Sequence, residues 1–137
     1  NLGWMQRYAE AAGVRFAPHG KTTMSPQLFR RQLEAGAWGL TFATVAQLRI
    51  GVEAGARRCL IANQVFDAGD LSAIVTLQSE HADLRVLFLL DSPAQLVARA
   101  RDQEAGSGLA WSAARAAGAR HASAGTVALR PPARHSA

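Results

Sequence analysis

Residues 25–63 contain the same pattern twice, a helix that ends at glycine and is followed by a strand: SPQLFRRQLEAGAWGLTFATVAQLRIGVEAGARRCLIAN. Ser25 and Pro26 are typical of a helix start, because a hydroxyl caps the free N–H groups and proline has no N–H to leave unpaired. The helix should end at Gly36, since glycine readily adopts the left-handed conformation that follows a helix. A strand is predicted next, over 38–44.

The second half of this stretch follows the same plan. Thr44 is a candidate cap for a helix that should end at Gly55, and an apolar strand is predicted over 58–63. A helix that stops at glycine and is followed at once by a strand is the building block of an α/β fold.

The same plan extends outward in both directions. Upstream, apolar spacing predicts a helix over 3–13, which ends at Gly13, and a short strand from Val14 to Ala17. Downstream, Asp70 is a candidate cap for a further helix. The nearly continuous apolar run 85–90 is typical of a parallel strand that is buried on both faces. Ser92-Pro93-Ala94-Gln95 has the composition of a capping box that begins another helix.

Helices and strands that alternate in this way predict parallel βα units joined by right-handed crossovers. A doubly wound sheet and a (βα)₈ barrel both satisfy the pattern. The first strand is followed by the turn Pro18-His19-Gly20-Lys21, whose single glycine makes a dinucleotide-binding fold a weak match. A barrel needs roughly 250 residues. The 137 residues therefore predict part of a (βα)₈ barrel, about half of one.

Residues 101–137 break the pattern. They are rich in Ala and Arg, and Pro131-Pro132 interrupts any regular element. A helix from Leu109 to Ala117 is possible because alanine favours helix, but no strand is expected. We interpret the chain as a partial barrel over 1–100 and an irregular tail over 101–137. The tail is either a natural linker or an out-of-frame translation of GC-rich DNA.

Composition and charge exclude several classes of protein. Of the 137 residues, 49% are hydrophobic and 18% charged, which is ordinary for a globular chain. No apolar stretch is long enough for a membrane span, and Asn1-Leu2-Gly3-Trp4 is unlike a signal peptide. The net charge of +5 comes with no basic run longer than two residues, so nucleic acid is not an expected partner. Cys59, the single cysteine, is compatible with a cytoplasmic protein without disulfides.

Lys21 is the only lysine among fifteen basic residues. It follows a predicted strand, and catalytic groups of parallel α/β folds gather at that edge. An amine can lose its proton and attack an aldehyde, which arginine cannot do. A surface lysine beside a helix cap is the alternative. Thr22, Thr23 and His19 share its loop, where hydroxyl groups also commonly serve the backbone.

The motif Pro18-His19-Gly20-Lys21-Thr22 resembles the Pro-His-x-Lys-Thr block of one family of fold-type III pyridoxal-phosphate enzymes. This is the D-threonine aldolase and D-serine dehydratase-like family, often described as amino-acid deaminases. Further matches cover about residues 1–100 and include Asn1, Met5, Gly13, Glu34-Ala35-Gly36-Ala37 and Thr41 to Thr44. The resemblance implies an alanine-racemase-like N-terminal barrel, which in that family precedes a β domain.

The resemblance also implies a function. Lys21 would be the catalytic residue, joined to pyridoxal 5′-phosphate as a Schiff base, with His19 and Thr22 also contacting the cofactor. The longer parent protein would be a cytoplasmic lyase, a homodimer acting on a small D-amino acid by dehydration or aldol cleavage. Its divalent-metal ligands, in a C-terminal domain, have no counterpart in this chain. The 137 residues alone should be inactive. The alternatives are a non-catalytic pyridoxal-phosphate protein of cofactor homeostasis and a plain α/β binding module.

Other residues are weaker candidates. Asn63, Gln64 and Asp91 each follow a predicted strand and are candidate pocket residues, although Asp91 is better explained as a helix cap. Core positions are expected for Trp38, Phe42 and Cys59, and a solvated loop position for His81.

Overall fold

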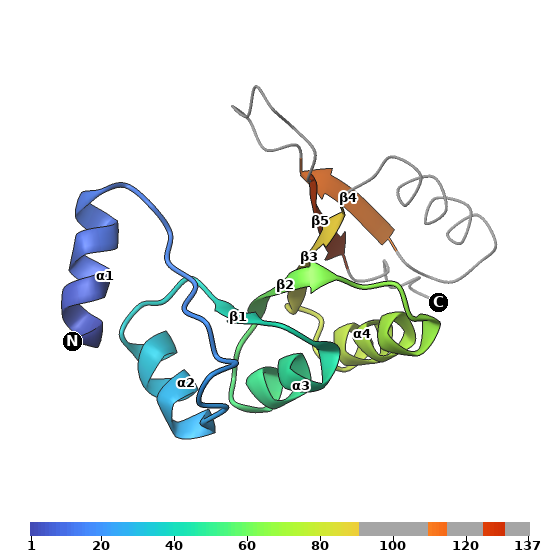
Figure 1. The fold of residues 1–137 in the computed structure, drawn as a ribbon, viewed down its shortest axis with the longest axis horizontal. Helices are drawn as coiled ribbons and strands as arrows, with labels where there is room; N and C mark the ends of the chain where they lie inside the picture. The colour runs from blue at the N-terminus through green and yellow to red at the C-terminus, as the bar shows by residue number, and fades with distance from the viewer. Residues whose placement is uncertain (91–109, 115–124, 131–137) are drawn as a thin grey trace. The chain divides into compact units, whose positions relative to one another are not determined.

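The computed structural model describes residues 1–90, 110–114 and 125–130, which form two compact units, 1–62 and 63–137 (Figure 1). The first unit begins with two helices, α1 (Leu2–Ala11) and α2 (Pro26–Glu34). Strand β1 (Leu40–Phe42), helix α3 (Val45–Glu53) and strand β2 (Arg58–Gln64) follow in that order. The last two residues of β2 belong to the second unit.

The helix boundaries follow the local chemistry of the chain. Ser25 Oγ accepts a hydrogen bond from the Leu28 N–H at 3.3 Å, and Thr44 Oγ1 accepts one from the Gln47 N–H at 3.3 Å. Both predicted caps are therefore confirmed. The three predicted stop glycines all have positive φ, as the left-handed position after a helix requires: Gly13 at 65°, Gly36 at 98° and Gly55 at 105°.

Parallel strands form the centre of the first unit. β1 and β2 are parallel, with Leu40 opposite Cys59 and Phe42 opposite Ile61. On the other side of β1, the segment 16–20 runs parallel to it and forms a single bridge between His19 and Thr41. In Figure 1, α2 and α3 lie next to each other beside this strand region. Helices alternate with parallel strands, so the fold is α/β, as the sequence predicts.

Two predicted strands differ from the observed ones. No strand forms over Val14–Ala17; the pairing begins at the Phe16 carbonyl and reaches its one bridge at His19. Pro18 has no N–H to donate, so it limits a regular ladder here. β1 is shorter than the predicted 38–44 because Gly39 weakens its start and Thr44 already serves as the cap of α3.

The core of the first unit is aromatic and aliphatic. Phe29 and Phe42 meet edge to face, with ring centroids 5.6 Å apart and an interplanar angle of 76°. Cys59 is fully buried, as expected, but Trp38 is half-buried and not part of the core. The other fully buried large side chains of this unit are Leu40, Leu48, Val52 and Ile61.

The second unit contains α4 (Ala68–Glu80), β3 (Arg85–Leu90), β4 (Ala110–Ala114) and β5 (Gly125–Arg130). The cap of α4 is Asp67, not the predicted Asp70. The Asp67 carboxylate accepts a hydrogen bond from the Asp70 N–H at 3.1 Å, so Asp70 lies in the first turn. The helix begins earlier because its capping acceptor is three residues upstream.

β3 has the predicted bounds. Arg85 is exposed, and from Val86 to Leu90 the side chains alternate between buried and half-buried, so the strand is fully buried on one face and not on both as predicted. It pairs antiparallel with β5, which in turn pairs antiparallel with β4. The expectation that the tail has no strand is therefore wrong, and so is the possible helix over 109–117. Cross-strand pairing outweighs the helix preference of alanine in this segment. The predicted capping box at 92–95 and the boundary near residue 100 lie outside the described residues.

Within the part of the chain that the structure describes, no helix combines the length and apolar character needed to cross a membrane.

Candidate functional site

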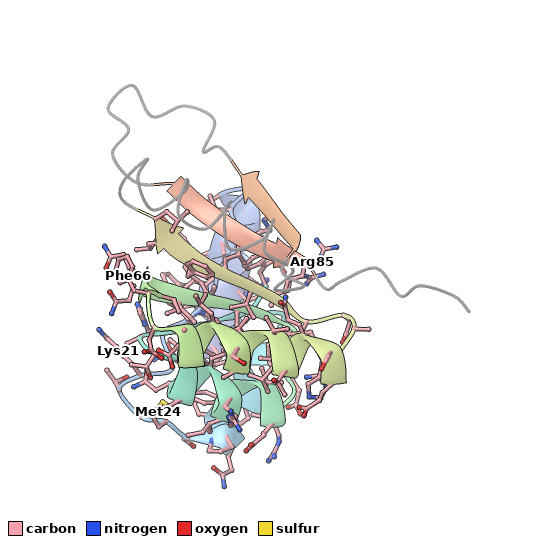
Figure 2. The ribbon with its side chains drawn as sticks, turned by 90° about the vertical axis from the view of Figure 1, so that its right-hand side faces the viewer. Lys21, Met24, Phe66 and Arg85 are labelled. Atoms are coloured by element: carbon pink, nitrogen blue, oxygen red, sulfur yellow. The ribbon has the colours of Figure 1, made fainter. Side chains whose placement is uncertain are left out.

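Lys21 lies at the carboxyl end of the segment that runs parallel to β1, at the first position of a turn over 21–23. Its side chain is exposed and projects away from the ribbon (Figure 2). The position agrees with the predicted one, at the edge of parallel strands where α/β enzymes place their reactive groups.

Thr41 attaches the Lys21 loop to β1. Its backbone N–H donates to the Pro18 carbonyl at 2.9 Å, and its carbonyl accepts from the Gly20 N–H at 2.8 Å. The buried Thr41 hydroxyl also donates to the Ala17 carbonyl at 2.8 Å. Three hydrogen bonds to one residue therefore hold the backbone immediately before Lys21.

Gly20 brings the loop into contact with the aromatic core. A Cβ at this position would lie 2.8 Å from ring carbons of both Phe29 and Phe42. Phe42 is enclosed further by α3, where a Cβ on Gly51 would overlap its ring. We refer to Gly20, Phe29, Phe42 and Gly51 as the Phe42 cluster. Only glycine fits between the two rings, so the cluster determines where the backbone preceding Lys21 lies.

The other side of Lys21 is held by a tight turn. The Met24 N–H donates to the Gly20 carbonyl at 3.0 Å, and the Thr23 N–H donates to the same carbonyl at 3.3 Å. Met24 has a φ of 43°, an uncommon conformation for a residue with a side chain. Strained backbone of this kind persists where its surroundings determine it and is often found at functional sites.

The Lys21 amine has no hydrogen-bond or ion-pair partner among the residues that the structure describes. The imidazole of His19 and the hydroxyl of Thr22 are also exposed and unpaired within residues 1–90, 110–114 and 125–130. The loop thus carries an exposed amine, an exposed imidazole and an exposed hydroxyl. A deprotonated amine in such a place can attack an aldehyde carbonyl and form a covalent bond with its carbon.

The remaining candidates lie elsewhere. Asn63 and Gln64 are the last two residues of β2 and belong to the second unit; the Gln64 N–H donates to the Asn63 side-chain oxygen at 3.0 Å. His81 is half-buried and ends α4. Asp91 lies outside the described residues. Across the described segments, no three His, Cys, Asp or Glu side chains are grouped to hold a metal ion.

Cys59 is a second nucleophile by residue type, but its surroundings make it inert. Burial raises the pKa of the Cys59 thiol from 9.0 to about 12, and the nearby positive charge of Arg57 opposes this only in part. The thiolate is the reactive form of cysteine. Cys59 therefore acts as a small apolar side chain of the core at neutral pH.

The sequence motif singles out Lys21, His19 and Thr22 as candidates, but it does not indicate the residues that position their loop. Gly20 has the sequence context of an ordinary turn glycine, and no pattern in the sequence marks the Thr41 hydroxyl or Met24. The proximity of Gly20 to the two phenylalanine rings depends on residues 9 and 22 positions further along the chain. No local pattern indicates such a contact.

Comparison with solved structures supports this description. The chain is similar to the crystal structure of a D-threonine aldolase from Filomicrobium marinum, with a TM-score of 0.66 and 28% sequence identity over 76% of this chain. The match covers 27% of the aldolase chain, so the 137 residues span about a quarter of its length. No family model and no curated protein matches the sequence. The similarity shows a D-threonine-aldolase-like fold.

Proposed function

We propose that this chain is the N-terminal part of a pyridoxal-phosphate-dependent lyase that acts on D-amino acids, and that Lys21 binds the cofactor aldehyde. The placement of Lys21 carries the proposal. It is the only lysine of the chain, it lies at the carboxyl edge of parallel strands, and Thr41 and the Phe42 cluster hold its loop. The similarity to a D-threonine aldolase supports the same class of reaction.

The residues of the loop fit this cofactor. The Lys21 amine is exposed and unpaired within the described segments, so it is available to an aldehyde. The Thr22 hydroxyl and the His19 imidazole are positioned in the same loop to hydrogen-bond polar atoms of a bound ring. When bound, pyridoxal phosphate supplies an electron sink for a carbanion at the substrate Cα.

Lys21 would have two tasks in the reaction. Its amine first holds the cofactor in place through a covalent bond. When it is not bonded to the cofactor, the Lys21 Nζ could accept or return a proton. The hydrogen bonds from Thr41 and the turn at Met24 restrict the backbone on both sides of Lys21, which favours a constant position of this amine.

Two reactions are compatible with this arrangement. Dehydration of D-serine would yield pyruvate and ammonia, and cleavage of a D-3-hydroxy amino acid would yield glycine and an aldehyde. Both begin with a change at Cα, so the loop alone does not distinguish them. The similarity to a D-threonine aldolase favours aldol cleavage. We further propose that the longer protein is a homodimer whose N-terminal domain is a complete (βα)₈ barrel.

A labelling experiment tests the assignment of Lys21. The protein is incubated with pyridoxal phosphate, treated with borohydride and mapped by peptide mass spectrometry. We expect one stable adduct on Lys21 and none on that peptide in Lys21→Arg, because the substitution keeps the charge but removes the nucleophile. The α-amine at the N-terminus of the purified protein is the internal control, since it is a second primary amine that the aldehyde can label.

The outcomes of this experiment are distinct. An adduct on the N-terminal α-amine alone, or activity that survives Lys21→Arg in the longer protein, would contradict the role of Lys21. An adduct on Lys21 without turnover of any D-amino acid by the longer protein would favour the non-catalytic alternative, a protein of cofactor homeostasis.

A further inference from the structure

Trp38 is contacted by two arginine side chains at the edge of the first unit opposite Lys21. The guanidinium carbon of Arg15 lies 4.9 Å from the centroid of the Trp38 ring, and that of Arg58 lies 5.9 Å from it. Both distances are within the range of cation–π contacts, about 6 Å. Arg15 and Arg58 are exposed, whereas Trp38 is half-buried.

The backbone holds these three residues in register. The Trp38 N–H donates to the Phe16 carbonyl at 2.8 Å, which places Trp38 next to the segment that begins with Arg15. On the other side, Gly39 lies so close to β2 that a Cβ there would overlap the Arg58 carbonyl oxygen. The three side chains thus come from the amino ends of three adjacent parallel segments. Their grouping is a consequence of the sheet and not of local sequence.

Within the part of the chain that the structure describes, neither guanidinium group has a charge partner. Arg15 and Arg58 make no hydrogen bond or ion pair with any residue that the structure describes. Each makes a cation–π contact with Trp38. The neighbouring Arg57 is different, since its guanidinium donates to the Val52 and Ala56 carbonyls at 3.1 and 3.0 Å. Among residues 1–90, 110–114 and 125–130, no anion therefore pairs with either of the two cations on this ring.

We propose that Arg15, Trp38 and Arg58 form a binding site for a multiply charged oxyanion of the phosphate type, either free phosphate or the phosphoryl group of a small ester. An arginine that packs on an aromatic ring keeps its N–H groups free to donate, and its planar fork matches the oxygens of a phosphate. A dianion bound by both guanidinium groups would offset the repulsion between their two positive charges. The site is separate from the Lys21 loop and does not depend on the function proposed for it.

Equilibrium dialysis of the 137-residue protein against labelled inorganic phosphate, at constant ionic strength, tests the proposal. We expect saturable binding of one phosphate per chain. Arg15→Gln and Arg58→Gln should each weaken it about tenfold, since each removes a charge-assisted contact. Arg49→Gln is the matched control, because it removes an exposed charge from α3 without touching Trp38 and should leave binding unchanged. Phenyl phosphate in a parallel dialysis separates the two sources: stronger binding than phosphate indicates an ester.

A second measurement needs no variant. Phosphate should slow the modification of Arg15 and Arg58 by phenylglyoxal, measured by peptide mapping, and should leave the rate at Arg49 unchanged. The proposal is overturned if no saturable binding occurs, if Arg49→Gln weakens binding as much as the other two substitutions, or if phosphate protects all arginines equally. In those cases the two guanidinium groups serve only to cover the tryptophan.

Discussion

At the scale of single residues, Gly20 joins the Lys21 loop to the core. The N–H of Gly20 is bonded to Thr41, and its Cα faces the rings of Phe29 and Phe42. Both rings are fully buried and packed edge to face, so they have little room to move away. The chemistry of the loop therefore depends on a residue whose contribution is the absence of a side chain.

Gly20→Ala tests this contact. The added methyl group would lie 2.8 Å from both rings, and we expect a loss of about 1–3 kcal/mol in the free energy of unfolding. The shifted loop should also slow the labelling of Lys21 by pyridoxal phosphate. Gly3→Ala, in α1, is the control and should not destabilise, because a Cβ there would contact only the Arg7 side chain, at 3.4 Å. Urea unfolding measures the stability of both variants. An unchanged midpoint for Gly20→Ala would show that the rings yield without cost.

Cys59 makes the stability of the protein depend on pH. The pKa of its thiol is raised from 9.0 to about 12 in the folded state, mainly by burial. The folded state therefore keeps a proton that the unfolded chain loses. The stabilising effect is complete below pH 9 and disappears as the pH rises toward 12, by about 1.4 kcal/mol per pH unit.

The measurement is urea unfolding at a series of alkaline pH values. Cys59→Ala should show a shallower loss of stability than the unsubstituted chain over this range, although it starts lower because of the cavity that it creates. Equal slopes for the two proteins would mean that the thiol is accessible to water in the folded state.

At the scale of elements, the helix termini carry much of the local order of the chain. α4 begins at Asp67, whose carboxylate bonds the N–H of Asp70, while α2 and α3 use Ser25 and Thr44 in the same way. Each cap satisfies an N–H group that would otherwise have no partner in its helix. The helix that follows the Lys21 loop, α2, is thus well defined at its start.

We expect Asp67→Ala to destabilise the protein by about 1 kcal/mol, through the loss of the cap of α4. Asp70→Ala should cost less, about 0.3–1 kcal/mol, because Asp70 contributes only its charge near the helix start. Asp67→Asn keeps the acceptor and should stay close to the original protein. Thermal unfolding followed by circular dichroism measures how much each variant is destabilised. A larger loss of stability for Asp70→Ala than for Asp67→Ala would contradict the assignment of Asp67 as the cap.

At the scale of the whole molecule, the chain spans about a quarter of the aldolase to which it is similar. Its candidate site contains an exposed amine at Lys21 and the exposed side chains of His19 and Thr22. If Lys21 binds the cofactor aldehyde as proposed, the groups that bind the cofactor phosphate would belong to the rest of the longer protein. On the proposed function, attachment and turnover are therefore separable properties.

The purified 137-residue chain should form the Lys21 adduct but should not convert D-threonine or D-serine. A cofactor that is held at one end only is not oriented for a reaction at Cα. Assays for glycine with aldehyde, and for pyruvate with ammonia, measure the two reactions, and the longer protein serves as the positive control. Turnover by the 137 residues alone would refute this expectation.

The sequence by itself determined the alternation of helices and strands, the caps at Ser25 and Thr44, and the glycines that end three helices. It also singled out Lys21, whose catalytic role stays a prediction. These features depend on neighbours within a few residues, where backbone conformation and capping are decided. Only the tertiary structure decided how Thr41 and the Phe42 cluster hold the loop, why Arg15 and Arg58 meet at Trp38, and that β4 and β5 form strands in an alanine-rich tail. Those features depend on contacts between distant segments, whose packing and pairing outweigh local preference.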